Sequence, residues 1–208
     1  DPFATLIDRD RAQAILRAAT AGADDGELFL ERRRSEALVY DDGRLRNASY
    51  DAAEGFGLRA VRGEVAGYAH STDISERALT RAAETARLAV GAGGGTLAAG
   101  PQGTNRRLYS DADPMEDATF ALKVETLREI DAYARSLDPR VVQVSATVAA
   151  SLQEVFILRP EGTLVSDIRP MARLNVSVIL EENGRRESGG TGGGGRAGLT
   201  AMMQPAHW

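Results

Sequence analysis

The sequence predicts an α+β fold with a mainly antiparallel β-sheet, two long helices and one shorter N-terminal helix. Short runs with apolar residues at every second position are separated by turns that contain Gly or Asn, which is typical of antiparallel strands. Three longer stretches have apolar residues at helical spacing. These helices come before and between groups of strands and do not alternate with single strands. That order argues against the βαβ arrangement of dinucleotide-binding folds.

The first part of the chain predicts one helix followed by about five strands. Residues 8–21 have helical apolar spacing, and Asp8 is the expected N-cap. Gly55, Gly57 and Gly67 lie inside predicted strands, where we expect them to allow close approach by a helix. The strands are expected at 27–33, 36–40, 44–50, 55–61 and 65–70, with tight turns at 41–43 and 62–64.

The two long helices are predicted in the middle of the chain. Residues 73–90 have a continuous apolar face and open on Asp73 and Glu76, a variant of the capping box. Residues 117–137 have an apolar stripe that runs from Phe120 to Leu137. Between the helices, residues 91–116 are rich in Gly, Pro and Asn and predict a long loop. Further strands are expected at 141–152, 155–158 and 163–168.

The stretch 167–196 is the most distinctive part of the chain. An alternating apolar run, residues 174–180, leads into Asn183-Gly184, the favoured pair for a type I′ hairpin turn. The return strand carries charge and then becomes rich in glycine, which predicts a sheet edge with approachable backbone. A flexible linker between two domains explains the glycines equally well on physical grounds. The candidate substrate- or partner-binding residues are Arg169, Arg173, Arg185, Arg186, Gly192, Gly193, Gly194, Gly195 and Arg196, with plain surface salt bridging as the alternative for the arginines.

Composition narrows the class of protein. A hydrophobic content of 43% and a charged content of 26% are those of an ordinary globular protein, and 208 residues suit one large domain or two small ones. The net charge of −5 argues against sequence-independent binding of nucleic acid. No apolar run approaches the ~20 residues of a membrane span, and no signal peptide precedes Asp1. We therefore expect a cytoplasmic protein without nucleic-acid or membrane partners.

A search for catalytic chemistry in the sequence finds no complete site. The chain has no cysteine, and its two histidines, His70 and His207, lack the spacing of a zinc site. Neither a Gly-x-Ser-x-Gly elbow nor a P-loop is present. The acidic pairs at 41–42 and 181–182 are adjacent along the chain, so on a strand their side chains point to opposite faces. The sequence therefore predicts no catalytic and no metal-binding residue in this chain.

Two phrases carry a family resemblance: GFGLRAVRGEVAGYAHSTDIS at residues 55–75 and GTLVSDIRPMARLNVSVILEENGRRESGGTGGGGR at residues 162–196. They resemble the N-terminal half of TldD-like proteins of the TldD/PmbA family, also named modulators of DNA gyrase. The likeness covers nearly the whole chain. It implies an N-terminal α+β domain followed by a C-terminal domain, in which a His-Glu-x-x-x-His helix and a later cysteine bind zinc.

The resemblance also implies a function. TldD-like subunits pair with a zinc-less TldE/PmbA-like partner and cleave peptides in the cytoplasm, in a cleft between domains. This sequence contains neither the His-Glu-x-x-x-His motif nor a cysteine, so we expect a substrate-cleft and assembly domain of such a zinc metalloprotease. Residues 1–198 would form this domain, and residues 199–208 would begin the connection to the zinc domain. The alternative is a stand-alone, non-catalytic module that dimerises with itself through its sheet edges.

Overall fold

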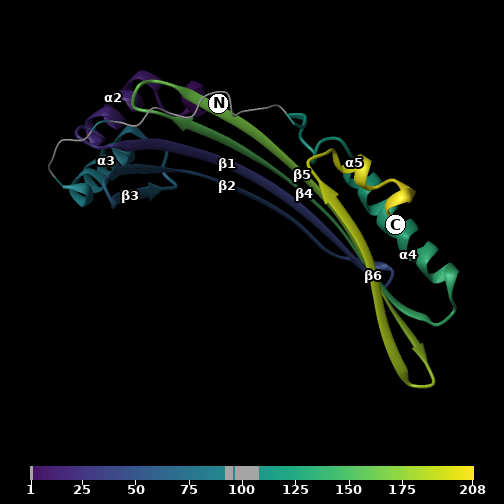
Figure 1. Cartoon of the computed structure of the whole chain (residues 1–208). Coiled ribbons are helices and arrows are strands. Elements are labelled where there is room, and N and C mark those ends of the chain that lie inside the picture. Colours follow the sequence, from purple (N-terminus) through teal and green to yellow (C-terminus); the bar gives the residue numbers. More distant parts are fainter. Residues whose placement is uncertain (1, 92–95, 97–107) are drawn as a thin grey trace. The chain divides into compact units, whose positions relative to one another are not determined.

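The computed structural model describes residues 2–91, 96 and 108–208. The described strands form one six-stranded sheet in the order β3-β2-β1-β4-β5-β6, which confirms the predicted α+β, mainly antiparallel class (Figure 1). The strands are β1 (Asp25–Asp41), β2 (Arg44–Arg62), β3 (Val65–Ser71), β4 (Val141–Leu158), β5 (Leu164–Glu182) and β6 (Arg185–Gly195). The helices are α1 (Pro2–Thr5), α2 (Arg9–Ala19), α3 (Glu76–Val90), α4 (Phe120–Leu137), α5 (Leu199–Met202) and the 3-10 helix η1 (Pro205–His207).

The strands are longer and fewer than the sequence predicts. The runs at 27–33 and 36–40 join into β1, those at 44–50 and 55–61 into β2, and those at 141–152 and 155–158 into β4. The predicted breaks were wrong because the joining residues hold neither proline nor a glycine turn. Pro170 is tolerated inside β5 because it lies beyond Ala172, the last residue of β5 that pairs with β6.

One helix begins at its predicted N-cap, and two begin at other residues than the sequence predicts. Asp8 caps α2 as predicted, since its Oδ1 accepts from the backbone N–H of Arg11 at 2.9 Å. The cap of α3 is Ser75, so the predicted Asp73 capping box was wrong. Helix α4 begins at Phe120 after the cap Thr119, three residues later than predicted. Both observed caps are hydroxyl residues in extended backbone, the geometry that N-caps favour.

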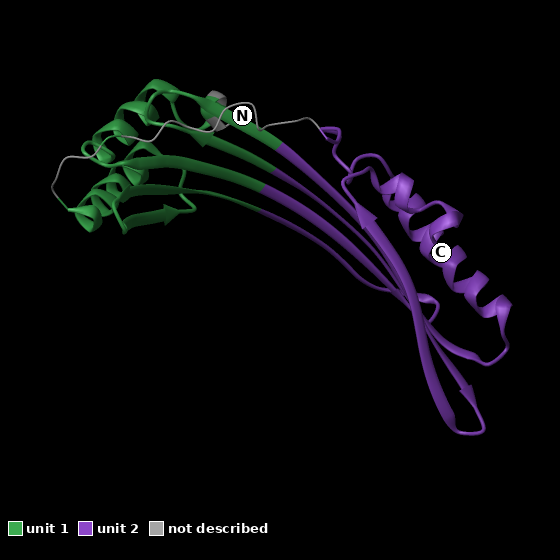
Figure 2. Ribbon diagram, viewed as in Figure 1, with its two compact units in different colours: residues 1–32, 53–106, 154–167 green, residues 33–52, 107–153, 168–208 purple. Residues whose placement is uncertain are grey.

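The chain divides into two compact units, coloured separately in Figure 2. Unit 1 comprises residues 1–32, 53–106 and 154–167, and its core packs α2 and α3 against one face of the sheet. Gly67 of β3 is where α3 approaches most closely, because a Cβ there would overlap the carbonyl oxygen of Ala86. The predicted close approach by a helix is therefore confirmed for Gly67. It was wrong for Gly55 and Gly57, which lie against Ser71 and Tyr68 of β3.

Unit 2 comprises residues 33–52, 107–153 and 168–208, and its core packs α4 and α5 against β-strand residues. Lys123 of α4 is only 2% exposed; its ammonium group donates to Glu36 at 2.5 Å and to the carbonyl oxygen of Met115 at 2.9 Å. The predicted apolar stripe was wrong at both ends, since Phe120 and Leu137 are 54% and 67% exposed. Helix α4 therefore packs through its middle and through one buried ion pair.

Two further expectations concern the ends of these elements. Most of the predicted 91–116 loop lies outside the described residues, and residues 108–113 contain neither helix nor strand. Leu199 and Met203 are buried in the core of unit 2. That residues 199–208 begin a connection to a further domain stays a prediction.

Within the described residues, no helix is long and apolar enough to cross a membrane.

Candidate functional site

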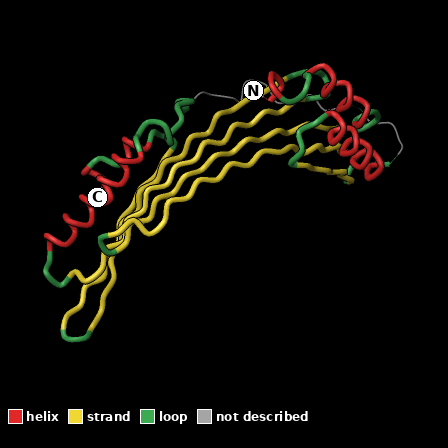
Figure 3. The backbone as a smooth tube through the Cα atoms, turned by 180° about the vertical axis from the view of Figure 1, so that it is seen from behind, coloured by secondary structure: helices red, strands yellow, loops and turns green. Residues whose placement is uncertain are grey.

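The glycine-rich stretch singled out in the sequence forms the edge strand β6. Asn183 and Gly184 both have positive φ, 52° and 78°, which confirms the predicted type I′ turn between β5 and β6. Figure 3 shows this hairpin as two strands joined by a short turn. All eleven residues of β6 pair antiparallel with β5, and no other described strand lies beyond β6. The predicted sheet edge is confirmed, and the linker explanation was wrong for residues 185–195.

The register determines which backbone groups of β6 point away from the sheet. The two-residue turn bonds Arg185 to Glu182, so these residues form a hydrogen-bonded pair. Hydrogen-bonded and non-hydrogen-bonded pairs alternate along an antiparallel ladder. The non-hydrogen-bonded residues of β6 therefore direct their N–H and C=O groups outward: Arg186, Ser188, Gly190, Gly192 and Gly194.

The glycines at alternate positions of β6 have different surroundings. A Cβ at Gly190, Gly192 or Gly194 would lie 2.8–2.9 Å from a carbonyl oxygen of β5. A Cβ at Gly193 or Gly195 would meet nothing within 4 Å. Non-hydrogen-bonded pairs bring the two strands closest, which explains the difference. Glycine is thus needed for close strand approach at the same positions whose backbone groups point outward.

The predicted arginines do not converge on one point. Arg185 pairs with Glu187 at 2.5 Å and Arg186 with Glu181 at 2.7 Å, and all four side chains are at least 36% exposed. Such exposed pairs contribute little to stability. Arg169 already has an interaction partner, and the guanidinium of Arg196 lies 5.1 Å from the centre of the Tyr109 ring.

Arg173 is the one predicted arginine placed directly over the glycines. It is opposite Gly194 in the register, and its Cγ is 3.3 Å from where a Cβ of Gly194 would lie. Its Nε donates to Oδ1 of Asn175 at 3.1 Å, and Asn175 is opposite Gly192. Within the described part of the chain Arg173 has no carboxylate partner. Its charge is therefore available to a carboxylate that approaches β6.

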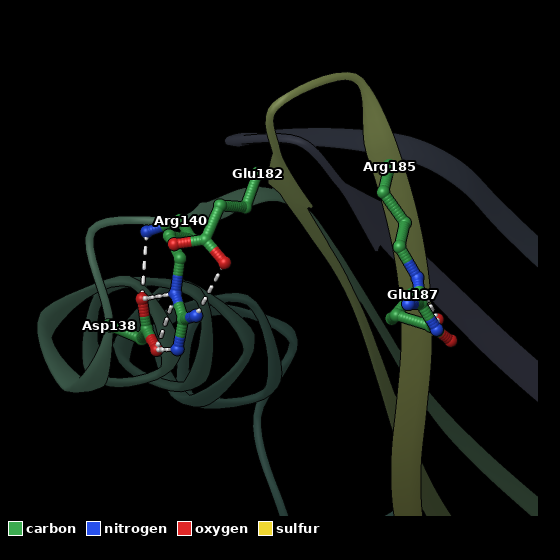
Figure 4. Close-up of polar contacts among 5 residues, drawn as sticks. All are labelled: Asp138, Arg140, Glu182, Arg185 and Glu187. Carbon is green, nitrogen blue, oxygen red and sulfur yellow. Dashed lines mark hydrogen bonds and ion pairs between the residues drawn. The ribbon is translucent and has the colours of Figure 1, made fainter.

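The turn end of the β5–β6 hairpin is joined to the turn after α4 by exposed polar contacts (Figure 4). Arg140 donates to Asp138 at 2.7 Å and to Glu182 at 3.3 Å. The side-chain hydrogen bond from Arg140 lowers the pKa of Asp138 to about 2, and the same bond raises the pKa of Arg140. The backbone N–H of Glu181 also donates to the carbonyl oxygen of Arg140 at 2.8 Å.

The acidic pairs are occupied by separate arginines. Asp42 pairs with Arg135 at 2.6 Å, and Glu182 with Arg140, while their sequence neighbours pair elsewhere. Among the described residues no group of three or more His, Asp or Glu side chains could hold a metal ion. The residues described thus do not fit a zinc site, and we derive no catalytic step from them.

One feature of unit 1 was missed by the sequence analysis. A groove of about 260 Å³ lies between β1, β2 and β3 and includes Phe29, Glu31, Tyr68 and His70 in its lining. The available signal was the i, i+2 spacing of Tyr68 and His70, which places both rings on one face of a strand. Gly57, opposite His70 in the register, leaves room beneath them.

The comparisons with known proteins cover both units. Residues 26–90 match the model of PmbA/TldA metallopeptidase domain 1, and residues 113–206 match that of the PmbA/TldA metallopeptidase central domain. A metalloprotease TldD homologue of Haemophilus influenzae is 37% identical over 180 residues, which are 85% of this chain and 37% of the relative. One from Buchnera aphidicola is 32% identical over 192 residues, 92% of this chain and 40% of the relative.

Solved structures show the same fold at low sequence identity. A proposed modulator of DNA gyrase from Thermotoga maritima superposes with a TM-score of 0.73 and 14% identity, over 96% of this chain and 46% of that one. TldE from Thermococcus kodakarensis superposes with a TM-score of 0.66 and 15% identity, over 95% of this chain and 47% of that one.

The two matches define the class of this chain as a first and a central domain of the kind described for PmbA/TldA metallopeptidases. The chain belongs to the TldD/PmbA family. It spans about two fifths of the length of the curated relatives it matches.

Proposed function

We propose that this chain is the substrate-cleft and assembly part of a TldD-like zinc metalloprotease, and that the outer edge of β6 holds the peptide. The observation that carries the proposal is the edge strand itself. Its outward backbone groups are unpaired by any described strand, and glycine occupies three of the five outward positions, at Gly190, Gly192 and Gly194. An extended peptide added to such an edge gains a ladder of main-chain hydrogen bonds.

The positive charge of Arg173 beside this edge could orient a bound peptide. Arg173 lies over Gly194 and has no described carboxylate partner, so it can pair with an acidic side chain or the C-terminal carboxylate of a peptide. The neighbouring pairs at Arg185 and Arg186 are exposed and neutral overall. Specificity at the glycines would come from the peptide backbone and from this one cation.

The remainder of the proposal follows the family. Metalloprotease relatives support a metal in the parent protein, which we propose is zinc held by residues outside those described here. The solved TldE structure supports a TldE/PmbA-like partner, with self-association as the other candidate. We place the whole protein in the cytoplasm, acting on peptides and not on nucleic acid, in keeping with the net charge of −5 on this chain.

An N-methyl scan of the peptide tests strand addition directly. The probe is a fluorescein-labelled heptapeptide with the sequence Val-Thr-Val-Ala-Val-Thr-Val, and its binding to the whole polypeptide is measured by fluorescence polarisation. Methylating an amide that bonds to β6 removes one hydrogen bond and should weaken binding about tenfold. Methylating the intervening amides should have little effect. Equal effects at all positions would reject strand addition.

A substitution in β6 tests strand addition by changing the protein instead of the peptide. Ser188→Pro removes an outward N–H and leaves the bonds to β5 intact, because proline is tolerated at edge positions whose N–H faces solvent. We expect it to weaken peptide binding and cleavage at least tenfold while zinc content is unchanged. Ser188→Ala keeps the N–H and should behave as the unsubstituted protein. Unchanged binding by Ser188→Pro would contradict the proposal.

The same edge also permits self-association, which is the alternative function of a stand-alone module. Two β6 strands from two copies would pair through the outward groups that a peptide would use. In that case Ser188→Pro would convert a dimer to a monomer in analytical ultracentrifugation. A peptide-binding edge instead predicts an unchanged oligomeric state.

A further inference from the structure

The groove of unit 1 lies on the face of the sheet away from α3. In β3, Gly67 faces α3, so Tyr68 and His70, one and three residues further on, face the opposite side. The register places His70 opposite Gly57 of β2. The ring of Tyr68 lies across Gly57, since a Cβ there would be 2.9 Å from Cε2 of the ring. Glycine thus forms the floor and aromatic rings form one wall.

The aromatic side chains of the wall are stacked on one another and exposed to solvent. The rings of Tyr68 and His70 are stacked, with centroids 5.7 Å apart and an interplanar angle of 29°. Tyr68 is 61% exposed although it stands on a sheet beside a buried core. Phe29 of β1 lines the same groove. Aromatic faces carry negative potential, which attracts cations.

The charges around the groove favour a cation. Glu31 lines it and has no ion-pair or hydrogen-bond partner within the described residues. Glu54, also in the lining, is neutralised by Arg32 at 3.1 Å. The nearby Arg59 is held by Asp25 at 2.9 Å and Glu27 at 3.3 Å, so it does not neutralise Glu31.

We propose that this groove binds the cationic side chain of a peptide, an arginine or a lysine, between Tyr68 and Glu31. A volume of 260 Å³ is below the roughly 300 Å³ at which pockets begin to hold whole small molecules, and it suits one side chain. The stem of the side chain would lie on the rings, and its charge would reach the Glu31 carboxylate. That the side chain comes from a peptide rests on the proposed function above.

The test uses a probe too short to add a strand. N-acetyl-arginine methylamide is titrated into the whole polypeptide, and the ring signals of Tyr68 and His70 are followed by NMR. The neutral analogue N-acetyl-citrulline methylamide has nearly the same shape. We expect the arginine probe to shift both rings and to bind two- to fivefold more tightly than the citrulline probe, because an exposed ion pair such as the one with Glu31 contributes roughly that much. Equal binding of the two probes would overturn the proposal.

Matched variants locate the binding. Tyr68→Ala should weaken binding of the arginine probe two- to fivefold. Tyr50→Ala removes a tyrosine of nearly the same exposure, 60%, outside the groove and should leave binding unchanged. Glu31→Gln should remove the preference for arginine over citrulline, while Glu64→Gln in the β2–β3 turn should leave it. Circular dichroism confirms folding. If Tyr68→Ala fails to fold, Glu31→Gln decides, and an unchanged preference in it would overturn the proposal.

The experiments distinguish failure of strand addition at β6 from failure of cation binding in the groove. If the N-methyl scan shows no position dependence but the arginine probe still shifts the rings, strand addition at β6 is wrong and the groove stands. If the scan succeeds but the probe binds no better than citrulline, β6 holds the peptide and the groove has no preference for cations.

Discussion

The two edge strands of the sheet, β3 and β6, are stabilised in different ways. β3 has seven residues, and Gly67, the third of them, lets α3 pack directly on its backbone. β6 has eleven residues, six of them glycine, and a Cβ at Gly193 or Gly195 would meet nothing within 4 Å. One edge is held by a helix and carries aromatic side chains. The other is held by its ladder to β5 and presents backbone.

This difference indicates what each edge is suited to bind. Exposed edge strands invite pairing with another chain, and proteins usually shorten them, cover them or place charges on them. β3 is short and packed, while β6 has charges only near its turn, at Arg185, Arg186 and Glu187. Beyond Ser188 no charged side chain of β6 protects its backbone. A strand that is long, bare and paired on one side is suited to a partner that is itself extended.

The largest expected effect is at the packed edge. Gly67→Ala places a methyl group against the backbone of Ala86. The clash cannot be relieved by moving a side chain, because the neighbouring atoms belong to the backbone of α3. We expect a loss of about 3 kcal/mol in the free energy of unfolding, measured by urea denaturation. Ala66→Ser, on the exposed side of the same strand, should stay within about 0.5 kcal/mol. Similar stabilities for the two variants would show that α3 does not pack closely on β3.

The bare edge should show an alternating response to the same methyl group. Gly192→Ala would bring its Cβ to 2.8 Å from the carbonyl oxygen of Leu174, so we expect a loss of about 1–2 kcal/mol. Gly193→Ala meets no neighbour and reduces the entropy of the unfolded chain, so a gain of about 0.4–1 kcal/mol is expected. Thermal melts of the two variants measure the difference. Equal shifts would mean that the register of β6 differs from the one described.

The smallest effect is expected beside the turn of the β5–β6 hairpin. The pKa of Asp138 is lowered to about 2 by Arg140, so its ionised form stabilises the fold above its ordinary pKa of 3.8. This contribution should be lost as the pH falls from about 4 to about 2. We expect Asp138→Asn to lower the melting temperature slightly at pH 6 and not at pH 2. A difference that persists at pH 2, or that salt does not reduce, would contradict the ion pair.

The sequence was a good guide wherever local chemistry decides the structure. Asn183-Gly184 predicted a type I′ turn, and Asp8 predicted an N-cap, because each depends on a few neighbouring backbone bonds. The fold class followed from the period of the apolar residues. The edge position of β6 followed from its lack of apolar side chains.

Features that depend on distant residues could not be predicted in this way. Lys123 interrupts an apolar stripe, and only the tertiary structure brings Glu36 to it, 87 residues away in sequence. The strand breaks were predicted where short apolar runs end. In the structure β1 and β4 continue through these polar residues, because each pairs with a neighbouring strand on both sides. The groove needs β1, β2 and β3 to be adjacent, so its residues looked unrelated in the sequence.

Amide hydrogen exchange in β6, followed by NMR with and without the heptapeptide, tests the central claim most directly. Without peptide, the outward amides of Gly190, Gly192 and Gly194 should exchange quickly, and those of Thr191 and Gly193, which bond to β5, slowly. Bound peptide should slow exchange at alternate positions, the outward ones. If saturating peptide leaves those amides as fast as before, β6 does not hold the peptide and the account is wrong.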